Sequence, residues 1–180
     1  MSKNVLIIQT SLRENSNSDA LAMKFADGAK DAGNNVEIVS LKNKKISFCT
    51  GCFACQSTGK CVINDDANEI TEKMLNADVI VWSTPIYYYE MSGQMKTMID
   101  RANSLYSSDY KFRNVYLLSV AADDEDNSDK RAISGIQGWI DCFENAEFSG
   151  SVFAGGVNDR GDIEGHKALE EAYRMGNEIV

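Results

Sequence analysis

Four of the five cysteines lie within thirteen residues and could bind a metal together. They are Cys49, Cys52, Cys55 and Cys61, with the spacing C-x2-C-x2-C-x5-C. Two-residue gaps let successive thiolates turn toward one point, as both zinc and iron–sulfur clusters require. Structural zinc sites typically combine two separated knuckles, so the compact triplet favours a four-iron, four-sulfur (4Fe-4S) cluster. Alternatively, the four thiols could stay free or form reversible disulfides that respond to oxidation.

A second segment whose residue types could bind a ligand spans residues 10–18. It reads Thr-Ser-Leu-Arg-Glu-Asn-Ser-Asn-Ser and leads into a helical pattern. A helix N-terminus offers unpaired N–H groups and the positive end of the helix dipole. Ser11, Asn17 and Ser18 add hydroxyl and amide donors, and Arg13 adds a guanidinium suited to phosphate. We therefore predict a phosphate-binding loop here. The alternative is an ordinary polar loop with a helix cap at Asn17 or Ser18.

Alternating strand and helix patterns must position these segments. Continuous apolar runs at residues 5–8, 79–82 and 115–118 suit buried parallel strands, and residues 36–39 and 151–154 complete a set of five. Helical periodicity fills the intervals between them. The predicted fold class is α/β, a doubly wound sandwich with a five-stranded parallel sheet in the order 2-1-3-4-5 and helices on both faces.

Ligands of such a sheet bind beyond the carboxyl ends of the strands, where the winding direction reverses. For this strand order, the loops concerned are residues 10–18, 83–92 and 121–128. Near its start the second loop contains Pro85, which restricts its backbone. Three consecutive tyrosines follow, and their aromatic faces could stack on a flat ring. The alternative is that these tyrosines merely close the end of a buried strand.

The first loop, strand-Ser-x-Arg-x3-Asn-Ser-helix, resembles the mononucleotide loop of the NAD(P)H-dependent FMN reductases, which are flavodoxin-like flavoproteins. Residues 83–96 resemble the family's Ser-Pro-x-Tyr…Ser-Gly-x-Met-Lys segment. Thr10, Leu12 and Ser16 depart from the Gly, Pro and Gly that the family prefers, which leaves the path of the first loop open. The resemblance implies a single flavodoxin-like FMN-binding domain over residues 1–180, with a cysteine-bearing insertion at about residues 42–64.

The same resemblance implies FMN as cofactor and NAD(P)H as electron donor. The residues that it places at the flavin are Ser11, Arg13, Asn17, Ser18, Pro85, Ile86, Tyr87, Tyr88, Tyr89, Ala121 and Ala122. The cysteine segment resembles that of the iron–sulfur flavoproteins, in which a 4Fe-4S cluster near FMN relays single electrons, and it implies that all four cysteines are ligands. Because similar insertions occur in reductases without a known cluster, free thiols stay open as the alternative.

The leading functional prediction is an FMN-dependent oxidoreductase that takes electrons from NAD(P)H and delivers them to a quinone, a flavin, a similar small acceptor or a redox protein. No side chain is predicted as a general acid or base, because the flavin carries the chemistry. The alternatives are a protein-to-protein electron carrier with FMN and a 4Fe-4S cluster, and a thiol redox sensor. The resemblance further implies a homodimer or homotetramer.

Net charge and hydropathy limit the classes of binding partner and the cellular location that we expect. A net charge of −9 argues against nucleic acid, and no apolar run is long enough to span a membrane. Without a signal-peptide pattern, the expected location is the cytoplasm. Cys142 is expected to be a buried thiol, and His166 to lie at a helix start. Asp100 and Arg101 are expected to form a structural ion pair or an interface contact.

Overall fold

The computed structural model describes residues 2–180 and contains a sheet of five parallel strands in the order β2-β1-β3-β5-β6, with the short strand β4 antiparallel to β3. The strands are β1 (Asn4–Gln9), β2 (Asn35–Ser40), β3 (Val79–Tyr87), β4 (Glu90–Met91), β5 (Asn114–Val120) and β6 (Glu147–Ala154). The helices are α1 (Asn17–Asp31), α2 (Ala54–Thr58), α3 (Ala67–Asn76), α4 (Gly93–Arg101), the 3-10 helix η1 (Asn103–Ser107), α5 (Lys130–Ile140) and α6 (Lys167–Asn177). With β4 set aside, this is the predicted strand order, and the predicted fold class is confirmed.

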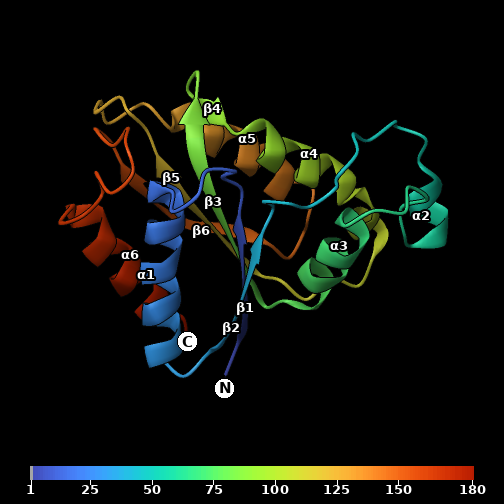
Figure 1. The fold of residues 1–180 in the computed structure, drawn as a ribbon. Helices are drawn as coiled ribbons and strands as arrows, with labels where there is room; N and C mark the ends of the chain where they lie inside the picture. Colours follow the sequence, from blue (N-terminus) through green and yellow to red (C-terminus); the bar gives the residue numbers. More distant parts are fainter. Residues whose placement is uncertain (1) are drawn as a thin grey trace.

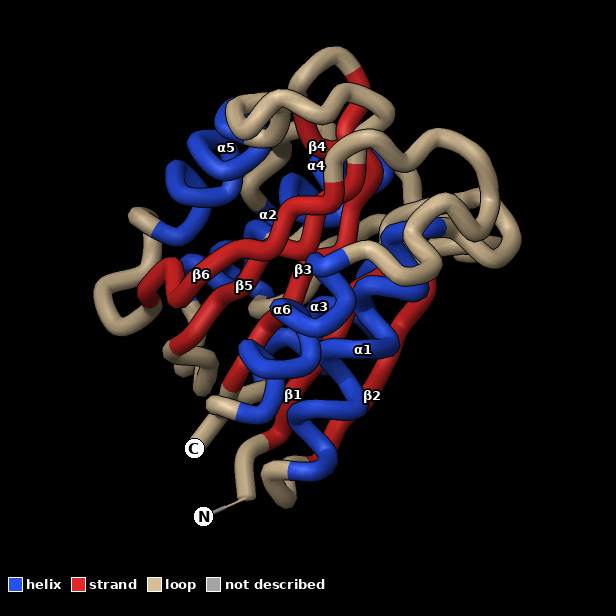
Figure 2. Tube along the Cα trace, turned by 90° about the vertical axis from the view of Figure 1, so that its left-hand side faces the viewer, coloured by secondary structure: helices blue, strands red, loops and turns tan. Residues whose placement is uncertain are grey.

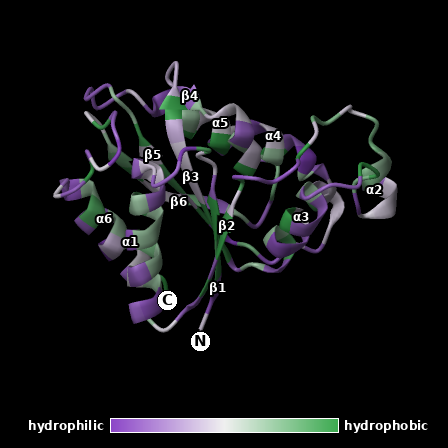
Figure 3. Ribbon diagram, viewed as in Figure 1, coloured by the Kyte–Doolittle hydropathy of each residue, from purple (hydrophilic) through white to green (hydrophobic). Residues whose placement is uncertain are grey.

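Helices cover both faces of the sheet, α1 and α6 on one side and α3, α4 and α5 on the other (Figure 1). Because neighbouring residues of a strand point to opposite faces, Val5 and Ile7 pack with α1 and α6, whereas Leu6 and Ile8 pack with α3 and α4. Both layers are apolar, which explains the continuous hydrophobic runs of the central strands, green between the helical layers in Figure 3. Within residues 2–180, no helix combines the length and apolar character needed to cross a membrane.

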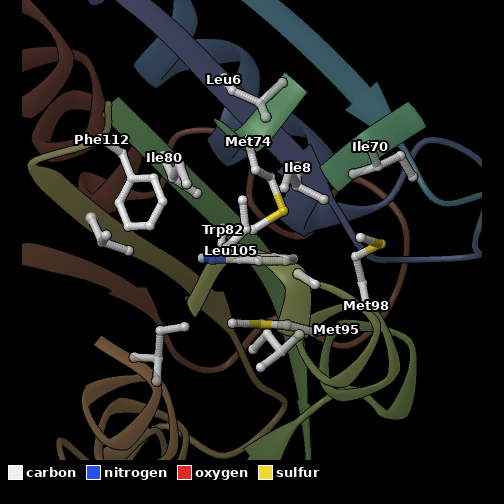
Figure 4. Packing of buried hydrophobic residues seen from close by; sticks show 14 of the residues in the cluster. Leu6, Ile8, Ile70, Met74, Ile80, Trp82, Met95, Met98, Leu105 and Phe112 are labelled. Atoms are coloured by element: carbon white, nitrogen blue, oxygen red, sulfur yellow. The ribbon is translucent and has the colours of Figure 1, made fainter. Parts of the chain in front are cut away.

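Trp82 of β3 is the largest fully buried side chain of the second layer. It lies close to Met74 of α3 and Met95 of α4 (Figure 4), both of which are also fully buried. An edge-on contact with Trp139 of α5 extends the packing, with the ring centroids 6.2 Å apart. The three helices on this face are therefore anchored to one central strand.

Helices α1 and α6 approach each other so closely that two glycines have no room for a side chain. A Cβ atom at Gly28 would collide with the carbonyl oxygen of Tyr173, and one at Gly176 would collide with that of Phe25. This contact fixes the position of α1, whose N-terminus follows the loop predicted to bind phosphate.

Strand β3 is longer than the sequence predicted, because residues 83–87 continue the strand instead of forming a loop. The carbonyl of Ser83 accepts a hydrogen bond from the backbone N–H of Thr10, so the backbone polar groups of Ser83 point toward β1. Because these groups alternate in direction along a strand, the backbone nitrogen of Pro85, two residues on, also points toward β1. The last β1 residue paired with β3 is Gln9, opposite Ser83. The missing N–H of Pro85 therefore removes no bond of the sheet, which explains how a proline fits a central strand.

The start of α6 lies at the predicted residue, whereas the cap of α1 does not. Ser92 caps α4, and His166 caps α6 by accepting a hydrogen bond at Nδ1 from the N–H of Ala168 at 3.1 Å. At α1 the cap is Ser16, rather than Asn17 or Ser18 as predicted. The side chain of Asn17 is instead bound to a distant loop, described below, which sequence periodicity does not reveal.

The cysteine-bearing segment lies between β2 and α3 and contains only the short helix α2. Figure 1 shows α2 at the edge of the molecule, beyond α3. This segment includes residues 42–64, for which the sequence predicts an insertion. It is held to the body of the protein by Arg101, whose contacts are described with the site.

Candidate functional site

The loops that follow β1, β3 and β5 gather at the end of the sheet opposite the two termini (Figures 1 and 2). They enclose a cavity of about 160 Å³. Its lining residues are Ser11, Arg13, Ser16, Asn17, Ser18, Pro85, Ile86, Tyr87, Val120, Ala121, Ala122, Val157 and Asn158. Nine of the eleven residues predicted to contact a flavin are among them.

The part of the cavity next to α1 is lined by buried polar side chains. Ser11, Asn17 and Ser18 are each less than a tenth exposed. The Oγ atoms of Ser16 and Ser18 lie 3.1 Å apart, and Ser16 Oγ accepts a hydrogen bond from the N–H of Asp19. A hydroxyl-rich surface at the start of a helix is a favourable site for a phosphate.

The segment after β6 closes this cavity from the side. Arg13 Nη1 donates a hydrogen bond to the carbonyl oxygen of Asn158 at 2.6 Å. Asn17 Nδ2 donates to the carbonyl oxygen of Asp159 at 2.8 Å, and Asn17 Oδ1 accepts from the N–H of Gly161 at 3.2 Å. Sequence reasoning missed Val157 and Asn158, although the predicted strand order already put the end of β6 at this edge of the sheet.

A network of fully buried hydroxyl groups joins the segments that surround the cavity. Thr10 Oγ1 donates to the carbonyl oxygen of Ser83 at 2.9 Å and accepts from Ser92 Oγ at 3.0 Å. Thr84 Oγ1 accepts from the N–H of Ser92, and Ser83 Oγ donates to the carbonyl oxygen of Ser18 at 2.7 Å. Thr10, which stands where the resembling loops prefer glycine, thus links β1 to β3 and α4, a role that the sequence did not indicate.

Tyr88 and Tyr89 lie at the tip of the β3–β4 hairpin and do not line the cavity. Their exposed fractions are 97% and 51%. The ring of Tyr89 lies 6.0 Å from the guanidinium of Arg131, within reach of a cation–π contact. Their contact with a flavin therefore stays a prediction, whereas Pro85, Ile86 and Tyr87 of the same segment line the cavity.

A second cavity, of about 400 Å³, brings together all five cysteines. Cys55 is buried on its inner wall, Cys61 is half-buried, and Cys49 and Cys52 are exposed. Cys142 also lines this cavity and is exposed, so the prediction of a buried thiol is wrong. The reason is that α5 ends at Ile140, which leaves Cys142 in the turn that follows instead of on the buried face of the helix. We call this cavity the cysteine pocket.

Arg101 of α4 holds both ends of the cysteine segment, and its partner is Asp65 rather than the predicted Asp100. Its guanidinium binds both carboxylate oxygens of Asp65, at 2.6 and 2.8 Å. It also donates to the carbonyl oxygens of Ser47 and Ile63, which flank the cysteines. Asp100 binds Lys96 instead, because consecutive residues of a helix do not face each other.

The ion pair with Arg101 determines the ionisation of Asp65. Burial raises the pKa of the carboxyl, but the hydrogen bonds from Arg101 and from the N–H groups of Ser47 and Ala67 outweigh it and lower the pKa to about 2. Arg101 in turn has a raised pKa, first because of its hydrogen bonds to Asp65 and further because the Cys61 sulfur lies beside it.

The donor set of the cysteine pocket suits a metal–sulfur group, since four thiols share one cavity with a buried cationic side chain. The sulfurs are not already gathered around a point. Across residues 2–180, no three Cys, His, Asp or Glu side chains are arranged to hold a metal ion. Cluster binding would therefore require the four sulfurs to come closer together than they are in this structure.

Comparisons with known proteins show the family and the fold of this chain. An iron–sulfur flavoprotein of Methanosarcina thermophila is 27% identical over 93% of this chain and 85% of its own length. One of Archaeoglobus fulgidus is 39% identical over 44% of this chain, a match that covers only 38% of that relative. An NAD(P)H:quinone oxidoreductase of Methanothermobacter marburgensis has the same fold, with a TM-score of 0.74 at 17% identity over the full length of both chains. The family model of the NADPH-dependent FMN reductases matches residues 3–132, so the chain belongs to that family, whose cofactor is FMN.

Proposed function

We propose that this protein is an oxidoreductase that uses FMN to move electrons from NAD(P)H to a small acceptor such as a quinone or a flavin. The observation that carries the proposal is the cavity at the carboxyl edge of the sheet. One part presents buried hydroxyl and amide groups at the start of α1, and another presents the apolar side chains of Ile86, Val120 and Val157. This division suits a cofactor with a phosphate at one end and a flat ring at the other.

FMN, when bound, supplies hydride and single-electron chemistry. Ser11, Arg13, Asn17 and Ser18 would hold the phosphate end, and Pro85, Ile86, Tyr87, Ala121 and Ala122 would line the ring. Arg13 and Tyr87 are the only ionisable side chains among the described lining residues. The role assigned to the protein is therefore to bind and orient, with no side chain as general acid or base.

We further propose that Cys49, Cys52, Cys55 and Cys61 bind a 4Fe-4S cluster. The proposal is supported by the compact spacing, by the shared cavity and by relatives that are named iron–sulfur flavoproteins. A cluster would also suit the second candidate function, electron transfer to or from a redox protein. We expect a homodimer or homotetramer in the cytoplasm, with the exposed hairpin tip at Tyr88 as a contact between copies.

Anaerobic mixing of the FMN-loaded protein with NADPH or NADH tests the main proposal. We expect the flavin absorption near 450 nm to bleach and then to recover when a quinone is added. Absence of bleaching by either nucleotide, together with reduction by a reduced redox protein, would contradict the reductase and favour the carrier. Iron and acid-labile sulfide assays on anaerobically purified protein test the cluster, and a flavin spectrum without iron would exclude it.

A further inference from the structure

Arg101 retains one hydrogen-bond donor that the protein does not use. Its Nη1 donates to Ser47 O at 2.8 Å and to Asp65 at 2.6 Å, and its Nη2 donates to Ile63 O at 3.1 Å and to Asp65 at 2.8 Å. These four bonds use all the Nη hydrogens of the guanidinium. The Nε–H has no partner among the described residues, although the side chain is 0% exposed. A buried donor without an acceptor is destabilising, so its retention calls for an explanation.

The surroundings of this donor indicate what it could bind. Arg101 lines the cysteine pocket together with Cys61 and the other cysteines. No oxygen acceptor is available to the Nε–H within residues 2–180. A negatively charged sulfur in the pocket, either a thiolate ligand or a sulfide, would satisfy it.

A second donor reaches the pocket from the same stretch of chain. Asn103, two residues further on at the start of η1, donates from Nδ2 to the sulfur of Cys55 at 3.4 Å. Cys55 is only 8% exposed, so this bond is shielded from water. Donors from the end of α4 and the start of η1 therefore face two of the four cysteines from the inner wall, whereas Cys49 and Cys52 lie on the open side.

We propose that the Nε–H of Arg101 and the Nδ2–H of Asn103 are donors to the sulfurs of the four-cysteine site, where they position Cys55 and Cys61 and make the bound cluster easier to reduce. The inference rests on the proposed 4Fe-4S cluster. One-electron reduction adds one negative charge without making or breaking a covalent bond, and the proposed flavin chemistry supplies that electron. Hydrogen bonds to sulfur stabilise the added charge and raise the reduction potential.

The test compares variants of the full chain after anaerobic reconstitution with iron and sulfide. Asn103→Leu removes the donor at nearly constant size, and we expect unchanged iron content with a midpoint potential shifted to more negative values in an EPR-monitored titration. Ser107→Ala is the matched control, since Ser107 lies on η1 and contacts α2 through the carbonyl oxygen of Gln56 without touching a sulfur. Its midpoint potential should equal that of the unmodified protein.

A second variant tests the Nε–H of Arg101, and its FMN absorption shows whether the protein is still folded. Arg101→Lys keeps a positive charge beside Asp65 but lacks Nε, and we expect a shift in the same direction, with FMN absorption reporting the fold. Loss of iron from Asn103→Leu that Asn103→Gln restores would also support the inference, whereas loss from both would overturn it. Unchanged potentials in Asn103→Leu and Arg101→Lys would overturn this inference alone. An unmodified protein without iron would instead refute the cluster itself, and this inference with it.

Discussion

At the scale of single residues, Arg13 is the cation of the proposed flavin site. Its guanidinium already lies at the cavity, held by the carbonyl oxygen of Asn158. A charge-assisted hydrogen bond contributes about 1.5–3 kcal/mol, so we expect Arg13→Ala to weaken FMN binding by roughly ten- to a hundredfold. Fluorescence titration of the apoprotein measures this, with Arg174→Ala on the exposed side of α6 as the control. Equal affinity in both variants would argue against the phosphate assignment.

The ion pair of Asp65 leads us to predict how the free energy of unfolding depends on pH. The pKa of its carboxyl is about 2 in the folded protein, against an ordinary value of 3.8. Because the folded-state pKa is depressed, the stabilisation is present above pH 4 and is lost as the pH falls toward 2, and it amounts to about 2 kcal/mol. Urea unfolding over this pH range should show the loss.

Two variants separate Asp65 from the other carboxylates. Asp65→Asn leaves the buried Arg101 without its counter-charge, so we expect the free energy of unfolding at pH 7 to fall by about 3–5 kcal/mol and its dependence on pH between 4 and 2 to weaken. The control is Asp100→Asn, which removes an exposed ion pair with Lys96. A pH profile of Asp65→Asn identical to that of the unmodified protein would refute the assignment.

At the scale of elements, the contact between α1 and α6 positions the start of α1 at the cavity. Gly28→Ala places a methyl group against the backbone of α6, and we expect it to lower the free energy of unfolding by about 1–3 kcal/mol. Gly138→Ala in α5 is the matched control, because nothing lies within 4 Å of its added Cβ atom. It should stabilise the protein by about 0.5–1 kcal/mol, since alanine favours a helix. Chemical denaturation measures both, and a neutral Gly28→Ala would contradict the packing.

The β3–β4 hairpin turns on two residues with left-handed backbone, Tyr88 at φ 52° and Tyr89 at φ 67°. A two-residue turn of this kind favours Asn-Gly, and each residue with a larger side chain lowers the free energy of unfolding by about 1 kcal/mol. We therefore expect Tyr88→Asn combined with Tyr89→Gly to raise the free energy of unfolding by about 1–2 kcal/mol. Neither tyrosine lines the cavity. FMN titration of the same variant therefore tests the predicted flavin contact, which a clear loss of affinity would support and an unchanged affinity would contradict.

At the scale of the whole molecule, the net charge of −9 repels negatively charged substrates. The acidic run at residues 123–126 lies directly after Ala121 and Ala122, which line the proposed site. NADPH is an anion, so we expect its rate of flavin reduction to rise roughly threefold between about 10 and 100 mM salt, as screening reduces the repulsion. Stopped-flow absorbance measures this rate.

The exposed residues Glu125 and Asp126 provide the control for this effect. Glu125→Gln combined with Asp126→Asn should reduce the salt dependence without changing FMN content. Asp123 is left intact, because its carboxylate accepts a hydrogen bond from Ser128 at 2.8 Å and so helps to hold the loop. An unchanged or opposite salt dependence would show that the acidic run has no part in substrate approach.

The sequence by itself determined the five parallel strands, their order and three of the four segments that form the cavity. It did so because these features depend on local periodicity and on chain direction, which a buried parallel sheet imposes on every residue of a strand. It also placed His166 at a helix start, and the resemblance to the FMN reductases identified nine of the residues that line the cavity.

Only the tertiary structure decided which distant residues meet. Asp65 binds Arg101, Asn17 binds the loop after β6, and Thr10 joins Ser92, at separations of 36 to 144 residues along the chain. No local pattern encodes such pairs. The same holds for Cys142, whose exposure follows from where α5 ends, and for the five cysteines that share one pocket. Spacing indicated that four thiols could act together, whereas their surroundings, with the buried Arg101 and Asn103 behind them, arise only from packing.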